Sequence, residues 1–240
     1  MDVYIVTGAS KGIGYELLKQ LRDKGSKAIG IARTIPEGME DFIAADLSIT
    51  NRLEELLASV IDDNLAGATS FTLVNNAGMV DPIGLIGFVN AQDIAGAIAL
   101  NLTAPMLLSN AFIAQLKDFE GTKRIVNISS GAGRNAYEGW GTYCTTKAGL
   151  DHFSRVVALE QANEQFPVDI VAIAPGIIDT GMQETIRASG EEAFPLLGQF
   201  IGYKEQGLLS TAEQTAEKLL MFMEKEDFQA VGSIADIRNF

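Results

Sequence analysis

The sequence predicts a doubly wound α/β fold, in which helices cover both faces of a parallel sheet, and three observations support it. Seven short apolar runs recur along the 240 residues, and most are continuous rather than alternating, as strands buried on both faces are. Segments with helical spacing separate these runs. No shift in composition divides the chain, so a single domain is expected over residues 1–240. The runs lie at 3–6, 28–31, 42–45, 71–74, 125–128, 170–173 and 232–235.

Two of the separating segments predict helices clearly. Apolar residues at 53, 56, 57, 60 and 61 follow the i, i+3, i+4 pattern after the polar Ser48 and Thr50. Thr211 and Gln214 can form a capping box at the start of a later helix. Because each strand is followed by a helix and another strand, right-handed crossovers between parallel strands are expected. Ligands of such sheets bind at the carboxyl ends of the strands.

Charge and cysteine content exclude several classes of function. Thirty-one acidic and eighteen basic residues give a net charge of −13, which repels nucleic acids and anionic membranes. The single cysteine, Cys144, cannot form an intramolecular disulfide, and no zinc pattern occurs, so no metal and a reducing, cytoplasmic location are expected. The most apolar stretch, 94–114, is interrupted by polar residues and a proline, so neither a signal peptide nor a membrane span is expected.

A glycine-rich turn follows the first predicted strand. Gly8, Gly12 and Gly14 form a GxxxGxG pattern that leads into a helical segment. Glycines allow a tight turn and close approach of the backbone, and the helix N-terminus offers unpaired N–H groups to a pyrophosphate. A plain strand-to-helix turn also uses glycine, but the strand and helix on either side favour a nucleotide site.

The second predicted strand ends at a cation. A carboxylate at this place would bind the ribose 2′-hydroxyl of NAD, whereas the chain has Arg33. Arg33 and Lys11 can pair with a 2′-phosphate, which favours NADPH over NADH. The alternative is that both are ordinary surface cations.

Tyr143 and Lys147 lie four residues apart and share one face if their segment is helical. A free tyrosine has a pKa of about 10, and a nearby ammonium and an oxidised nicotinamide both favour the phenolate. Tyr143 is therefore a candidate proton donor to a carbonyl that is reduced by hydride. By itself, such a pair is common on solvated helix faces.

Seven patterns occur in order along the chain, and together they resemble the short-chain dehydrogenase/reductase family over essentially its whole length. The patterns are Thr7-Gly8 with Gly12 and Gly14, Asp46-Leu47, NNAG at 75–78, Asn101, NISS at 127–130, Tyr143 with Lys147, and Pro175-Gly176 with Thr180.

The resemblance implies a catalytic role for four residues. Tyr143 would be the acid, and Lys147 would hold the nicotinamide ribose and lower the pKa of the tyrosine. Ser130 would orient the substrate carbonyl, and Asn101 would hold a water of the proton relay. Ser130 is preferred to Ser129 because it precedes Tyr143 by the thirteen residues typical of the family and because neighbours on a strand face opposite ways.

The resemblance also implies a binding site for NADP(H), with the pair Ser10 and Lys11 similar to the NADP-preferring pattern. The predicted cofactor-binding residues are Gly8, Ser10, Lys11, Gly12, Ile13, Gly14, Arg33, Asp46, Leu47, Asn76, Ala77, Gly78, Tyr143, Lys147, Pro175, Gly176, Ile178 and Thr180.

Within the family, the segments 101–105, 131–140, 143–149 and 176–183 are similar to those of benzil reductases and sepiapterin reductases. This similarity implies reduction of one carbonyl of an aromatic 1,2-diketone such as benzil, giving a hydroxy ketone. A lid at about 181–207 carries apolar residues that suit such a substrate. The predicted substrate contacts are Ser130, Trp140, Tyr143 and Met182.

Two other functions remain open. The chain could be a 3-oxoacyl or general alcohol/ketone oxidoreductase of the same family, or a nucleotide-sensing binding protein that lacks catalysis. The resemblance further implies a homodimer or homotetramer formed through the segments that contain Asn101 and Lys147.

Overall fold

The computed structural model describes residues 1–225 and 227–240 and confirms the doubly wound fold. One sheet of parallel strands has the order β3-β2-β1-β4-β5-β6-β7. Glu226, in the acidic run at 224–227 that we expect to be a solvated helix end, lies outside the described residues. The strands are β1 (Asp2–Thr7), β2 (Lys27–Ala32), β3 (Phe42–Ala44), β4 (Ser70–Asn75), β5 (Thr122–Ile128), β6 (Asp169–Ala174) and β7 (Ile234–Asp236).

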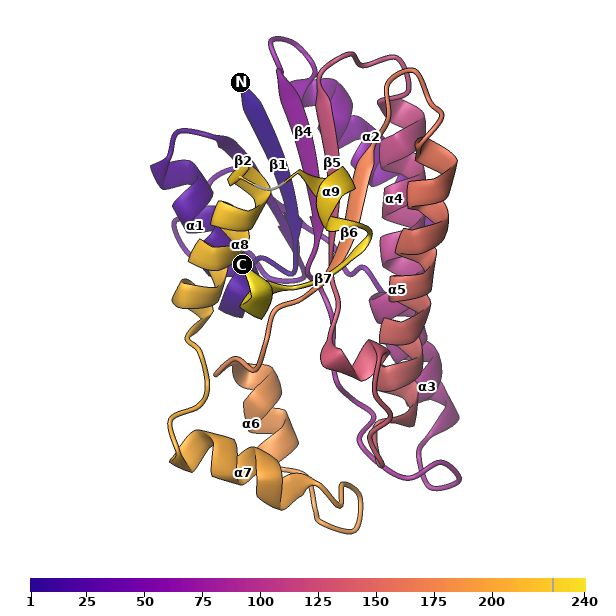
Figure 1. The fold of residues 1–240 in the computed structure, drawn as a ribbon, viewed down its shortest axis with the longest axis vertical. Helices are drawn as coiled ribbons and strands as arrows, with labels where there is room; N and C mark the ends of the chain where they lie inside the picture. The colour runs from indigo at the N-terminus through magenta and orange to yellow at the C-terminus, as the bar shows by residue number, and fades with distance from the viewer. Residues whose placement is uncertain (226) are drawn as a thin grey trace.

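Helices cover both faces of the sheet, as Figure 1 shows. On one face, α1 (Gly12–Asp23) and α8 (Ala212–Lys225) bury their apolar sides against the strands. On the other face lie α2 (Leu53–Asn64), α4 (Ala104–Gln115) and α5 (Gly141–Gln161). The remaining helices are α3 (Ala91–Ile98), α6 (Gly181–Arg187), α7 (Leu197–Glu205) and α9 (Phe228–Val231), with short turns η1 (Thr50–Arg52), η2 (Ala99–Thr103), η3 (Gly131–Gly133) and η4 (Ile237–Asn239).

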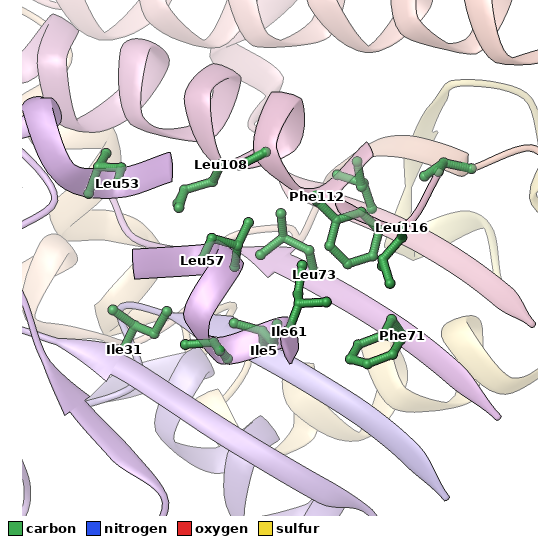
Figure 2. Packing of buried hydrophobic residues seen from close by; sticks show 14 of the residues in the cluster. Ile5, Ile31, Leu53, Leu57, Ile61, Phe71, Leu73, Leu108, Phe112 and Leu116 are labelled. Carbon is green, nitrogen blue, oxygen red and sulfur yellow. The ribbon is translucent and has the colours of Figure 1, made fainter. Parts of the chain in front are cut away.

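The helical spacing seen in the sequence produces the core on the α2 face. Leu57 and Ile61 project from α2 toward Ile5 and Leu73 of the sheet, and Phe112 of α4 closes the cluster (Figure 2). All five side chains are fully buried. Each contributes roughly 1.5–3 kcal/mol through loss of apolar surface to water, so this packing fixes the positions of the strand ends.

The start of the last strand differs from the sequence prediction. Gly232, expected in the strand, has φ of +83° and instead ends the short helix α9, where its N–H donates to the Phe228 carbonyl at 3.0 Å. A positive φ is typical of glycine after a helix and is incompatible with a strand. The capping box is confirmed, because Thr211 and Gln214 exchange side-chain to backbone hydrogen bonds of 3.0 and 3.1 Å.

One helical stretch of the described chain, Ala91–Gln115, has the length and apolar composition of a membrane span, with a mean hydropathy of 1.5. Within its most apolar segment of 18 residues, 44% is buried inside the fold. Leu108 and Phe112 of this stretch are fully buried beneath the sheet. Its apolar residues therefore contribute to the core.

The carboxyl ends of the parallel strands gather at one edge of the sheet. Gly8 follows β1, Arg33 follows β2, Asn76 follows β4, Ser130 lies just beyond β5, and Pro175 follows β6. In Figure 1, α6 and α7 lie beyond this edge, below the sheet in the view. The topology thus brings together residues that are far apart in the sequence.

Candidate active site

A cavity of about 1300 Å³ lies at this edge, between the strand ends and the helices α6 and α7. The four predicted substrate contacts line it, as do all the predicted cofactor residues except Gly14. Asn101 does not line it either. The predicted residues in its wall are Gly8, Ser10, Lys11, Gly12, Ile13, Arg33, Asp46, Leu47, Asn76, Ala77, Gly78, Ser130, Trp140, Tyr143, Lys147, Pro175, Gly176, Ile178, Thr180 and Met182.

Hydrogen bonds fix the glycine turn to the loop after β4. The Thr7 hydroxyl accepts the N–H groups of Asn76 and Ala77, both at 3.0 Å, and the Asn76 amide donates to the Thr7 carbonyl at 2.9 Å. A Cβ on Gly8 would lie 2.7 Å from the Ala77 Cα, so only glycine allows this approach. Helix α1 begins at Gly12, and Gly12 and Ile13 of its first turn line the cavity, which fits the pyrophosphate of a dinucleotide because a helix N-terminus offers N–H groups to an anion.

Gly14 has a packing role rather than a place in the cavity wall. A Cβ at this position would lie 2.5 Å from Asn76 Nδ2 and 2.7 Å from the Gly8 carbonyl oxygen. The absence of a side chain lets α1 pack tightly against the two loops. Gly14 therefore packs against Gly8 and Asn76, two of the predicted cofactor-binding residues, without lining the cavity itself.

Two cations and a carboxylate of the predicted cofactor site lie in the cavity wall. Arg33 and Lys11 are exposed in the cavity wall. Asp46 accepts hydrogen bonds from the Ser48 hydroxyl at 2.7 Å and the Ser48 N–H at 3.0 Å, and these bonds lower its pKa, with a smaller contribution from Arg33. The ionised Asp46 is thus held by Ser48, which leaves the two cations available to an anion.

Tyr143 lies in the first turn of α5 with only 7% of its surface exposed. Burial raises its pKa to about 12, although the Ser130 hydroxyl acts in the opposite direction. Desolvation of the phenolate therefore outweighs the other influences on this pKa, and the lowering by Lys147 that the resemblance implies stays a prediction. The phenol is protonated at neutral pH, which suits a proton donor.

Lys147 lies one helical turn after Tyr143, and its ammonium is buried. Nζ donates to the Ile128 carbonyl at 2.8 Å and lies 5.7 Å from the centre of the Tyr143 ring. Burial lowers the pKa of Lys147 to about 8, while the negative charge of Asp151 raises it. The residue is consequently charged at neutral pH and places a cation beside the phenol.

The next turn of α5 carries a buried carboxylate that the sequence analysis missed. Asp151 accepts a hydrogen bond from the Ser129 hydroxyl and another from Arg134 Nε at 3.2 Å. Ser129 is thus directed toward α5, whereas the Ser130 hydroxyl lies by Tyr143 and accepts the Ala132 N–H at 3.1 Å. The signal was present, because Asp151 follows Lys147 by four residues on the same helix face.

Asn101 lies in η2, a π turn that joins α3 to α4. Its amide donates to the Met79 carbonyl at 2.7 Å, and its Oδ1 accepts the Met79 N–H at 2.9 Å. Only 1% of the residue is exposed. The side chain therefore holds the backbone after Gly78 in place, and its predicted role in binding a water stays a prediction.

An aromatic cluster forms one wall near Tyr143. The Trp140 ring stacks on Phe194 with centroids 4.8 Å apart and meets Phe200 and Tyr143 edge to face at 5.1 and 5.4 Å. Met182 Sδ lies 4.0 Å from the Tyr143 hydroxyl. Phe194 and Phe200 belong to the predicted lid, so the wall combines the start of α5 with this segment.

The segment that contains α6 and α7 is attached to the loop after β6. Ile178 forms an isolated bridge with Ser210, and the Asp179 carboxylate forms ion pairs with Arg187 of α6 and Lys204 of α7. Both lid helices are thus tied to one residue beside Thr180.

Several cavity residues were not among the predicted site residues. Tyr137, Gln183 and Arg238 line the cavity, and Arg238 forms an ion pair with Asp236 at 2.6 Å. Arg238 follows the carboxyl end of β7, so the rule that ligands bind at strand ends was sufficient to find it.

Comparison with known proteins identifies the family. The family model described as short chain dehydrogenase matches residues 2–191. The chain belongs to this family. Its sheet order and the positions of its strand-end residues agree with the resemblance found in the sequence. It is an oxidoreductase that acts on carbonyl or CH–OH groups with NAD(H) or NADP(H), and the alternative of a nucleotide sensor without catalysis is wrong.

Individual relatives cover nearly the whole chain. The benzil reductase ((S)-benzoin forming) of Bacillus subtilis is 38% identical over 248 residues, which cover 100% of both proteins. The sepiapterin reductase of Mus musculus is 31% identical and covers 95% of this chain and 94% of its own length. A short chain dehydrogenase/reductase from Saccharomyces cerevisiae has a similar structure, with a TM-score of 0.83 and 26% identity over 99% of this chain and 96% of that one.

Replacement of Asp151 by asparagine tests the electrostatic link to Lys147. The carboxylate raises the pKa of Lys147, so its neutralisation lowers that pKa further. The ammonium is then lost at a lower pH, and the alkaline limb of the pH profile of kcat/KM shifts to lower pH, with a loss about threefold greater at pH 8.5 than at pH 7. Carbonyl-dependent oxidation of NADPH gives this profile. An alkaline limb that stays in place or moves up contradicts the link.

Proposed function

We propose that the chain is an NADPH-dependent carbonyl reductase that converts an aromatic 1,2-diketone such as benzil to a hydroxy ketone. The arrangement of Tyr143, Ser130 and Lys147 beside an aromatic wall carries this proposal. The similarity to a benzil reductase along the entire chain supports the choice of substrate. We place the substrate between Tyr143 and a lid that residues 181–207 form. The lid belongs to the same single domain as the rest of the chain.

The side chains have complementary tasks in the proposed reaction. Lys147, Pro175, Gly176 and Thr180 of the cavity wall would hold a dihydronicotinamide, which would supply the hydride for the carbonyl carbon. Tyr143 Oη gives its proton to the carbonyl oxygen, and burial favours this because the phenol is protonated at neutral pH. The Ser130 hydroxyl binds the same oxygen and orients it. The Lys147 ammonium, 5.7 Å from the ring centre, stabilises the phenolate that remains.

The aromatic wall fits an aryl ketone. Trp140 presents a ring fixed on one side by Phe194, and Met182 adds a polarisable sulfur beside the Tyr143 hydroxyl. Flat apolar side chains bind an aryl group by dispersion and by removal of its surface from water. The wall thereby brings an aryl-substituted carbonyl against Tyr143 and excludes water from it.

The cofactor preference follows from charge at the adenosine end. Arg33 and Lys11 are exposed there, and the nearest carboxylate, Asp46, is held by Ser48. A 2′-phosphate would be attracted to the two cations, and a carboxylate at position 33 would repel it. We therefore infer a preference for NADPH.

The resemblance implies a homo-oligomer, and we infer that a second copy of this chain packs on the face formed by α4 and α5. Apolar side chains are exposed on α4 and α5, among them Met106, Val156 and Leu159. These two long helices lie together on one side of the molecule in Figure 1. Pairing of two copies through this side would remove these side chains from water.

Replacement of Tyr143 by phenylalanine tests the proton donor. Since the ring and its packing are kept, NADPH binding stays within about twofold, while kcat for benzil falls by about a thousandfold or more. Absorbance at the reduced-nicotinamide band measures turnover, and chiral chromatography identifies the hydroxy ketone. Turnover near the wild-type rate sinks the assigned role. Faster reduction of a β-keto thioester than of benzil by the wild type points to the 3-oxoacyl alternative.

Replacement of Arg33 by aspartate tests the cofactor preference. The new carboxylate repels a 2′-phosphate and can accept a bond from a 2′-hydroxyl, so the ratio of kcat/KM for NADPH to that for NADH drops by about a hundredfold. The matched control is Arg52→Asp, which makes the same charge change at an exposed residue that does not line the cavity. A variant as selective for NADPH as the wild type removes the argument.

Replacement of Leu159 by glutamate tests the proposed pairing. Leu159 is 74% exposed, so the change leaves the fold intact but buries a charge in the interface. Light scattering after size exclusion is expected to show a smaller assembly than the wild type at equal concentration, whereas Leu208→Glu, at another exposed leucine, has no such effect. Equal masses for Leu159→Glu and the wild type disprove pairing through this face.

A further inference from the structure

The indole of Trp140 has a buried N–H without a hydrogen-bond partner. Within residues 1–225 and 227–240, three buried side-chain polar atoms lack a partner, namely Asn75 Oδ1, Arg124 Nε and Trp140 Nε1. Only Trp140 among these residues lines the large cavity, and it is 5% exposed. The unpaired donor therefore belongs to a residue of the cavity wall.

Leaving this donor unpaired destabilises the protein unless a ligand provides an acceptor. Buried N–H groups are almost always paired, and exceptions concentrate at functional sites. The neighbours of the indole are the rings of Phe194, Phe200 and Tyr143, with centroids 4.8, 5.1 and 5.4 Å away. Ring faces are weak acceptors at best, so a carbonyl oxygen would be a much better partner.

The position of Trp140 suggests which oxygen this is. Trp140 immediately precedes α5 and lies three residues before Tyr143, whose ring it meets edge to face. In the proposed function, Tyr143 and Ser130 bind the oxygen of the carbonyl that is reduced. A second donor beside them has no task with a simple ketone. A 1,2-diketone carries a second oxygen on the adjacent carbon.

We propose that Trp140 Nε1–H donates a hydrogen bond to the oxygen that is not reduced, so that the site selects vicinal dicarbonyl compounds over simple ketones. This inference rests on the proposed function, and it identifies the Trp140 indole N–H as the group that recognises the second carbonyl. The indole only donates, because it keeps its proton throughout, and the second carbonyl remains in the hydroxy ketone product. Phe194 and Phe200 of the 181–207 segment pack on the indole, and the proposal requires that the N–H becomes accessible to the substrate oxygen when the substrate binds.

A kinetic comparison of two ketones isolates this hydrogen bond. Deoxybenzoin has the skeleton of benzil with one carbonyl replaced by CH₂. Their intrinsic reactivities cancel when the ratio of their kcat/KM values is compared between two forms of the enzyme. In Trp140→Phe, which keeps an aromatic ring without a donor, the benzil-to-deoxybenzoin ratio falls about five- to tenfold.

The control variant is Phe194→Leu, which alters the packing on the same indole but removes no polar atom. It changes kcat/KM for both ketones by the same factor and leaves their ratio as in the wild type. If Trp140→Phe also leaves the ratio unchanged, the inference is overturned. If Trp140→Phe does not fold, Trp140, the only tryptophan of the chain, can be replaced biosynthetically by its benzothiophene analogue, in which sulfur takes the place of N–H.

A binding measurement separates failure of this inference from failure of the proposed function. Since the chain has one tryptophan, labelling with ¹⁵N-indole gives a single side-chain signal in a ¹H–¹⁵N spectrum. With NADP⁺ present, so that no reduction occurs, benzil shifts the Nε1 proton downfield and deoxybenzoin does not. An unmoved signal, or equal shifts with both ketones, refutes the hydrogen bond. A shift specific to benzil without turnover by the wild type refutes only the reductase proposal.

Discussion

The contact between the Lys147 ammonium and the Ile128 carbonyl positions the candidate active site. It joins the second turn of α5 to the carboxyl end of β5, so the phenol one turn earlier lies above the sheet edge where the other strands also end. Asp151, one turn later, adds a second attachment through Ser129 and Arg134. Tyr143, Lys147 and Asp151 thus lie on successive turns of one face of α5. Through them, the helix links the packed sheet to the side chains that line the cavity.

Burial has opposite effects on the two titrating groups of this face. It raises the pKa of Tyr143 to about 12 and lowers that of Lys147 to about 8, because the charged form of each loses solvation. Both groups are nevertheless protonated at neutral pH, which is the state that a reductase needs before it donates a proton. Asp151 maintains this state by opposing the effect of burial on Lys147.

Much of the fold could be predicted from local patterns, and the exceptions have physical reasons. The spacing of Leu53 and Leu57 predicts α2 because one face of a helix must be apolar to pack on a sheet. Gly232 was predicted to lie in a strand because it begins an apolar run, and such a run does not indicate that its first residue has a positive φ. In the site, the patterns at the strand ends predicted residues of which nearly all lie in the cavity wall, although many other residues also line it. The packing of Gly14, the hydrogen bonds of Asn101 and the unpaired N–H of Trp140 depend on three-dimensional neighbours, which no spacing in the sequence contains.

The central claim is that burial keeps Tyr143 a protonated acid, and its own titration tests this most directly. The difference between the ultraviolet pH titrations of the wild type and Tyr143→Phe isolates the tyrosinate absorbance of this residue among the five tyrosines of the chain. The account predicts a midpoint above the usual value for tyrosine, near the raised pKa of about 12. A midpoint below about 10 contradicts it, because burial would then not be the dominant influence on this pKa.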